Sequence, residues 1–70
     1  MIGARIRELR RKRGWSQEQL GTMIGFSQSK ISKIENGGWD SLSDLKLLAA
    51  ALDVKLEDLV KEEQNDGDEK

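Results

Sequence analysis

Serines and glycines divide this chain into short stretches, and that division limits the length of any helix or strand it can form. Ser16, Ser27 and Ser41 each precede a run with apolar residues at helical spacing, and a glycine lies shortly before each of them. Serine is a preferred helix N-cap, whereas glycine readily adopts the left-handed conformation in which many helices end. There is no proline and no alternating apolar pattern, so nothing favours strands. The pattern predicts an all-α fold of short helices.

Five helices are expected. Their ranges are residues 2–12, 17–24, 28–35, a fourth that starts after Ser41, and a fifth from 56 to about 61. The apolar residues at helical spacing that should face a shared core are Ile2, Ile6, Leu9, Ile31, Ile34, Leu42, Leu45, Leu48, Ala49, Leu52, Val54 and Leu59. We expect residues 1–61 to form one domain, because residues 62–70 contain no apolar side chain and are typical of an acidic disordered tail.

The composition excludes several classes of protein. The 70 residues make one small domain, and the chain has no cysteine or histidine for disulfides or the usual zinc sites. No apolar run approaches the roughly 20 residues that a membrane-spanning helix needs. No signal-peptide pattern follows Met1, so we expect a cytoplasmic protein. The absence of histidine, cysteine and a glycine-rich phosphate loop also argues against an enzyme, and we expect no catalytic residue, metal, cofactor or small-molecule ligand.

The net charge of −1 conceals a marked asymmetry between the two halves. Residues 1–36 hold eight Lys/Arg against three Asp/Glu, a balance of +5, whereas residues 37–70 hold four against ten, a balance of −6. The basic half is compatible with a polyanionic partner. Its basic run of Arg11, Lys12 and Arg13 either steers the chain toward that partner or only keeps the first helix soluble.

The helices expected at 17–24 and 28–35 are joined only by Gly25, Phe26 and Ser27. Two short helices joined by a glycine turn are typical of a helix-turn-helix unit, whose second helix is presented outward. The polar outer face of a short helix of this kind fits a major groove about 12 Å wide.

Three specific motifs follow one another in the chain: WSQEQL at 15–20, GFSQS at 25–29 and ISKIENG at 31–37. They are followed by the leucine–alanine spacing of SLSDLKLLAAALDVKLEDL. In this order the motifs resemble the Cro and lambda-repressor type of helix-turn-helix domain, the xenobiotic-response-element family of bacterial and phage regulators. The resemblance covers Ile2 to Val60. It implies a compact five-helix lambda-repressor-like DNA-binding domain. It also implies a sequence-specific transcriptional regulator, most simply a repressor, that inserts Gln28–Glu35 into the major groove of double-stranded DNA.

The resemblance implies that four residues on the outer face of 28–35 read bases, namely Gln28, Ser29, Ser32 and Lys33. The chemistry of these side chains suits that role. Glutamine can form two hydrogen bonds to adenine, serine is adaptable, and lysine can reach guanine O6 and N7. The alternative interpretation of the same side chains is an ordinary solvated helix face.

The resemblance also implies contacts to the DNA backbone. The residues at the matching positions are Gln17, Ser27, Lys30, Asn36 and Arg10. Gln17 begins a helix, where free backbone N–H groups favour a phosphate, although it is also an ordinary first-turn residue. Arg10 is further expected to pair with Glu35 and so to join the first helix to the third.

Dimers are common in this family and read two half-sites, so a homodimer is expected. The resemblance favours Leu56 and Val60 as interface residues, with Leu47 in reserve. The alternative to a DNA-reading function is a protein-interaction module, such as an antitoxin or an adaptor, built on the same fold. The chain departs from the family pattern in three places. Gly21 stands where alanine is usual, Trp15 replaces a common leucine, and the loop at 37–40 lacks the usual proline and basic residues. Within that loop, Trp39 is either a lid on the core or a surface residue.

Overall fold

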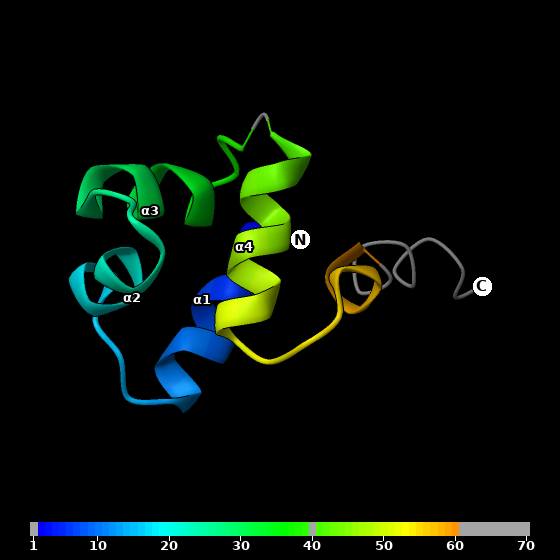
Figure 1. The fold of residues 1–70 in the computed structure, drawn as a ribbon, viewed down its shortest axis with the longest axis horizontal. Helices are drawn as coiled ribbons and strands as arrows, with labels where there is room; N and C mark the ends of the chain where they lie inside the picture. Colours follow the sequence, from blue (N-terminus) through cyan, green and yellow to red (C-terminus); the bar gives the residue numbers. More distant parts are fainter. Residues whose placement is uncertain (1, 40, 61–70) are drawn as a thin grey trace.

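The computed structural model describes residues 2–39 and 41–60, and these form a small bundle of helices (Figure 1). The four labelled helices are α1 (Ile2–Lys12), α2 (Gln17–Ile24), α3 (Gln28–Glu35) and α4 (Leu42–Ala51). Residues 56–60 are also helical, at the end of the described chain. The described residues contain no strand, which confirms the all-α prediction. The expected tail at 62–70 lies outside the described residues.

The serines cap the helices as predicted. The Ser16 hydroxyl accepts a hydrogen bond from the backbone N–H of Gln19 at 3.0 Å, and the Gln19 side chain accepts one in return from Ser16 N–H at 2.7 Å. This reciprocal capping box satisfies two backbone donors that a helix start leaves without partners. Ser27 caps α3 in the same manner, accepting from Lys30 N–H at 3.1 Å. Gly25 ends α2 with φ of 80°, a conformation that glycine adopts without steric penalty.

The core is made of aliphatic residues from all the helices. The fully buried ones are Ile6, Leu20, Ile31, Leu45, Leu48, Leu52 and Leu59. One expectation was wrong, because the Leu42 residue is 53% exposed. Leu42 lies on the same side of α4 as the buried residues Leu45 and Leu48. It is exposed because it occupies the first turn of α4, and this turn lies at the margin of the core.

The helix pairs α2–α3, α1–α3 and α2–α4 pack against one another. In Figure 1, α2 and α3 lie side by side at one end of the molecule, with residues 56–60 at the other. Helix α1 reaches the end of α3 because residue 3 is glycine. A Cβ atom there would lie 2.5 Å from the Glu35 carbonyl oxygen. At Gly21 a Cβ would collide with the carbonyl oxygen of Phe26, so the turn after α2 needs the space that alanine would fill.

Among the described residues, no helix combines the length and the apolar character needed to cross a bilayer.

Candidate nucleic-acid interface

Helix α3 divides its side chains between the core and an open surface. Ile31 and Ile34 are 0% and 3% exposed and pack in the core. On the opposite side, four polar residues of α3 and one of α2 line a single shallow depression: Gln17, Gln28, Ser29, Ser32 and Lys33. The structure therefore brings the four residues expected to read bases together on one face, beside the glutamine expected to hold a phosphate.

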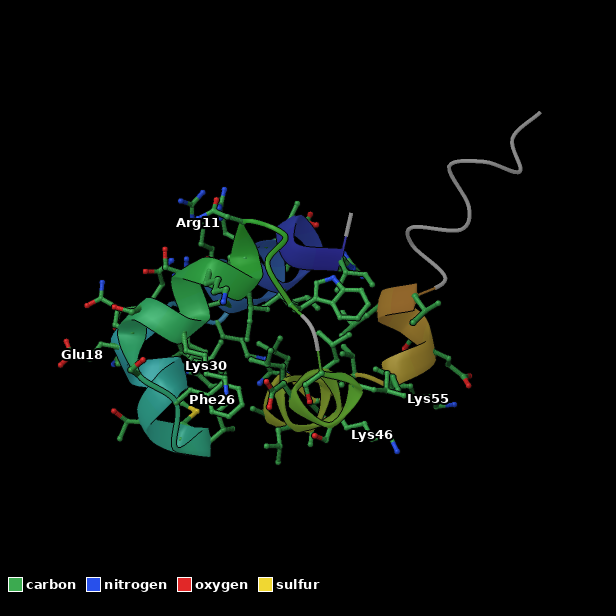
Figure 2. The ribbon with its side chains drawn as sticks, turned by 90° about the horizontal axis from the view of Figure 1, so that it is seen from above. Arg11, Glu18, Phe26, Lys30, Lys46 and Lys55 are labelled. Carbon is green, nitrogen blue, oxygen red and sulfur yellow. The ribbon has the colours of Figure 1, made fainter. Side chains whose placement is uncertain are left out.

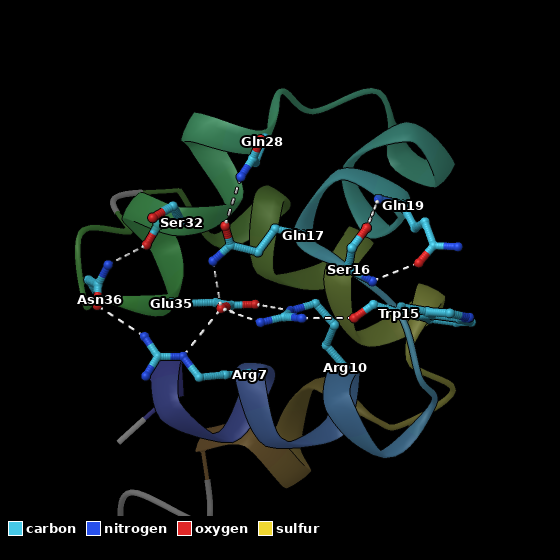
Figure 3. Close-up of polar contacts among 10 residues, drawn as sticks. All are labelled: Arg7, Arg10, Trp15, Ser16, Gln17, Gln19, Gln28, Ser32, Glu35 and Asn36. Carbon is cyan, nitrogen blue, oxygen red and sulfur yellow. Dashed lines mark hydrogen bonds and ion pairs between the residues drawn. The ribbon is translucent and has the colours of Figure 1, made fainter.

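A buried carboxylate, Glu35, lies next to Gln17 at the margin of this surface (Figure 3). Arg10 Nε donates to Glu35 Oε2 at 2.6 Å and Arg10 Nη2 donates to Oε1 at 3.1 Å. A third bond, from Arg10 Nη1 to the Trp15 carbonyl oxygen at 2.8 Å, fixes the remaining edge of the guanidinium. The predicted Arg10–Glu35 pair is thus present, and it joins α1 to α3.

The DNA-backbone contact expected of Arg10 stays a prediction, and the geometry argues against it. The Arg10 side chain is only 8% exposed, and its guanidinium is occupied by Glu35 and by Trp15. A phosphate would have to displace strong, charge-assisted hydrogen bonds to reach it. Arg10 is better placed to hold Glu35 than to bind a ligand.

Gln17 is held between the carboxylate and the first residue of α3. Its Nε2 donates to Glu35 Oε1 at 3.1 Å, and its Oε1 accepts a long hydrogen bond of 3.5 Å from Gln28 Nε2. The backbone contact expected of Gln17 stays a prediction. The structure also shows that Glu35 orients the side-chain amide of Gln17 by accepting its hydrogen bond. Sequence spacing alone did not indicate this contact.

The sequence pattern did not single out Arg7, yet it belongs to the same cluster. Its Nε donates to Glu35 Oε1 at 3.4 Å, and its Nη2 donates to Asn36 Oδ1 at 3.0 Å. Asn36 in turn donates from Nδ2 to the Ser32 carbonyl oxygen at 2.9 Å. The available signal was helical phase, because Arg7 precedes Arg10 by three residues and so lies on the same side of α1.

The acidity of Glu35 reflects this environment. Burial on its own raises the pKa of the carboxyl group, because the charged form is desolvated. Hydrogen bonds from Arg10, Gln17 and Arg7, together with the positive charge of Arg10, outweigh burial and hold the pKa of Glu35 below its ordinary value. The group is therefore ionised at neutral pH and keeps its donors in place.

Two other residues expected at the DNA backbone have partners inside the protein. Lys30 Nζ lies 3.3 Å from Asp44 Oδ2. It also lies 4.1 Å from the centre of the Phe26 ring, and Figure 2 shows these two labelled side chains together. A phosphate contact from Lys30 would compete with Asp44. Ser27 is the N-cap of α3. Neither role in DNA binding is tested by this geometry, and both stay predictions.

The residues expected at a dimer interface differ in exposure. The Leu47 and Val60 residues are 46% and 41% exposed, whereas Leu56 is half-buried and packs against the core. Trp39 is 39% exposed and lines a second depression with Ser29, Lys33 and other residues, so it is not a closed lid on the core.

Comparison with known proteins agrees with this architecture. The family model described as Helix-turn-helix matches residues 6–59. The uncharacterized HTH-type transcriptional regulator RghRB of Bacillus subtilis strain 168 is 45% identical over 61 residues, covering 84% of this chain and 44% of that protein. The HTH-type transcriptional regulator SlrR of the same strain is 43% identical over 61 residues, covering 84% of this chain and 40% of that protein. The chain thus spans less than half the length of these two relatives.

A solved structure, the SinR protein/SinI protein complex, superimposes with a TM-score of 0.81 at 33% identity, covering 93% of this chain and 65% of that one. The lambda-repressor-like fold predicted from the motifs is therefore confirmed. The chain belongs to the helix-turn-helix family, and the two relatives named above are transcriptional regulators.

Proposed function

We propose that this protein binds double-stranded DNA in a sequence-specific manner and regulates transcription, with α3 as the helix that enters the major groove. The observation that carries the proposal is the polar face of α3, where Gln28, Ser29, Ser32 and Lys33 share one open depression with Gln17. Amides, hydroxyls and an ammonium group are the donors and acceptors that distinguish base pairs in the major groove. Helix α3 has 8 residues and is about 12 Å long at 1.5 Å per residue, a length comparable with the major-groove width of about 12 Å.

The residues of this surface fall into those that contact bases and those that contact phosphates. Side chains on the outer face of α3 meet base edges and supply specificity. Gln17 and Asn36, at neighbouring positions around Glu35, meet phosphates and fix the register of α3 in the groove. The Glu35 carboxylate is a positioning group in this scheme, since it is buried beneath residues that would contact DNA.

We further propose that the functional unit is a homodimer. One small module makes few contacts, and two copies reading half-sites a helical turn apart would raise affinity and specificity together. Leu47 and Val60 are the candidates with exposed apolar surface, and Leu56 contributes less because it packs inward. The simplest regulatory consequence is repression, since a bound dimer would occlude a promoter.

Selection from a pool of random double-stranded DNA with the purified chain tests this function. The expected result is an enriched, roughly palindromic sequence that binds far more tightly than a scrambled duplex at physiological salt. The absence of any enriched sequence, with only weak binding that disappears as salt rises, would leave the nonspecific phosphate interaction alone and would refute sequence-specific recognition.

A protein-interaction module is the second candidate, and one observation favours it. The similar solved structure is described as a complex of two proteins, SinR and SinI. A protein partner in place of DNA would predict weak binding to all DNA sequences in the selection, without enrichment. A protein partner in addition to DNA is compatible with an enriched sequence and would regulate its occupancy.

A further inference from the structure

We propose that Arg7 supplies a charged contact to a phosphodiester of the DNA backbone, where α1 meets the end of α3. This inference rests on the proposed function and adds to it a residue that the family motifs did not indicate. Three observations carry it: the charge balance around Glu35, the orientation of the Arg7 guanidinium, and its place beside Gln17 and Asn36.

The side chains that meet at Glu35 carry two positive charges and one negative charge. Two guanidinium groups, those of Arg7 and Arg10, share the single carboxylate of Glu35. Arg10 takes it with two bonds of 2.6 and 3.1 Å, whereas Arg7 makes one longer bond of 3.4 Å. Arg10 is therefore the partner that neutralises Glu35. Arg7 keeps a charge that the protein does not compensate at this position.

The guanidinium of Arg7 is fixed from two sides and still accessible. Glu35 holds its Nε, and Asn36 Oδ1 accepts from its Nη2 at 3.0 Å. Asn36 is itself anchored to the Ser32 carbonyl oxygen. Three of the five N–H groups of Arg7 have no hydrogen-bond partner among the described residues, and its side chain is 35% exposed. A preorganised fork with free donors is the geometry that binds a phosphate in a bidentate manner.

The position of Arg7 matches the edge of the proposed interface. Arg7 Nε and Gln17 Nε2 both donate to Glu35 Oε1, so the two side chains lie on either side of one oxygen atom. Figure 3 shows this row continuing from Gln28 through Gln17 to Glu35, and on to Arg7 and Asn36. A DNA strand that contacts Gln17 and Asn36 would pass the guanidinium of Arg7 as well.

Arg7 has a rival role that is purely structural, as a brace for Glu35 and Asn36. Salt dependence separates the two. A phosphate contact by a cationic side chain releases a counterion, and each such contact contributes about 0.9 to the slope of log affinity against log salt concentration. A brace inside the protein contributes nothing to that slope, even if its loss weakens binding.

The test compares the wild-type chain with Arg7→Gln, Arg7→Lys and Lys46→Gln at several salt concentrations. The probes are the duplex recovered by selection and a scrambled duplex. Lys46→Gln removes the same charge from an exposed position on α4, away from the Glu35 cluster, and Figure 2 places Lys46 on the opposite side of the molecule from Arg11 of α1. Thermal unfolding of each variant confirms that it is folded at the assay temperature.

For Arg7→Gln the expected result is about a tenfold loss of affinity on both duplexes and a salt slope smaller by about 0.9. Arg7→Lys should keep the slope because it keeps the charge, and Lys46→Gln should keep both affinity and slope. If Arg7→Gln binds with the wild-type slope, whatever its affinity, the inference is overturned and Arg7 is a brace.

An NMR titration of the wild-type chain covers the case in which Arg7→Gln does not fold. The Nη–H signals of Arg7, which include the donors left without a partner, should shift when duplex is added, and unmoved signals would refute the contact. A wild-type chain that binds neither duplex would overturn both the inference and the proposed function. A wild-type chain that enriches a sequence, together with an unchanged slope in Arg7→Gln, would overturn the inference alone.

Discussion

Arg10 and Glu35 are 25 positions apart in the chain, and their side chains meet at 2.6 Å in the interior of the domain. The Arg10 side chain is 8% exposed and the Glu35 side chain is fully buried. The pair determines more than the contact of α1 with α3. Because Glu35 also accepts hydrogen bonds from Arg7 and Gln17, it orders the side chains that border the proposed DNA-binding surface.

Removal of Arg10 should destabilise the protein strongly. Arg10→Met leaves the Glu35 carboxylate buried without its main partner, and such losses typically cost about 3–5 kcal/mol. The free energy of unfolding measured by urea denaturation checks this. The matched control is Glu8→Gln, which breaks an exposed ion pair with Arg5 and should cost about 0.5 kcal/mol or less. Similar losses in the two variants would contradict the assigned role of the buried pair.

The stability of the domain should fall in acid partly through Glu35. Its pKa is lower in the folded state than in the unfolded chain, so the folded state binds the proton less readily. The resulting stabilisation is complete above the unfolded pKa, about 4.3, and is lost as the pH falls from there through the lower folded pKa. Unfolding free energies measured across this range should decline more steeply for the wild type than for Glu35→Gln. Parallel profiles would mean that Glu35 is not the responsible group.

Gly21→Ala should destabilise the protein although alanine is the better helix former. Propensity alone would favour alanine by about 1 kcal/mol. The added methyl group, however, would collide with the Phe26 carbonyl oxygen, a backbone atom that cannot turn aside. We expect a net loss of about 1–3 kcal/mol in urea denaturation, with Thr22→Ala at the next, exposed position changing stability by about 0.5 kcal/mol or less. A more stable Gly21→Ala would show that the turn relaxes without cost.

Gln17→Ala should weaken binding to all DNA sequences to a similar extent, because phosphates carry no sequence information. The measurement is the dissociation constant for the selected and the scrambled duplex, each compared with the wild type. Gln17 also donates to Glu35, so the free energy of unfolding of the variant has to be measured alongside. A loss confined to the selected duplex would reassign Gln17 to base readout, either directly or through its contact with Gln28.

The helices and their ends were predictable because local signals determine them. Ser16 and Ser27 cap helices with their own side chains, and Gly25 ends α2 through its backbone freedom, so no distant contact is needed to read them. The exposure of Leu42 was not predictable from phase. Helical spacing reports which side of a helix a residue lies on and does not report where the neighbouring helices end.

The candidate site was predictable only in part. The outer face of α3 followed from spacing and from family motifs, and so did the Arg10–Glu35 pair. The additional partners of Glu35 did not, because the meeting of Arg7, Gln17 and Asn36 depends on how α1, α2 and α3 cross. The ion pair between Lys30 and Asp44 was not predictable for the same reason, because it depends on the position of α4 relative to α3.

Base readout by the outer face of α3 can be tested with the single substitution Gln28→Ala. The measurement is the ratio of dissociation constants for the scrambled and the selected duplex, taken at one salt concentration for the wild type and the variant. We expect Gln28→Ala to lose about 1–3 kcal/mol on the selected duplex and little on the scrambled one, so the ratio should fall. An equal loss on both duplexes, with the ratio unchanged, would contradict base readout by Gln28.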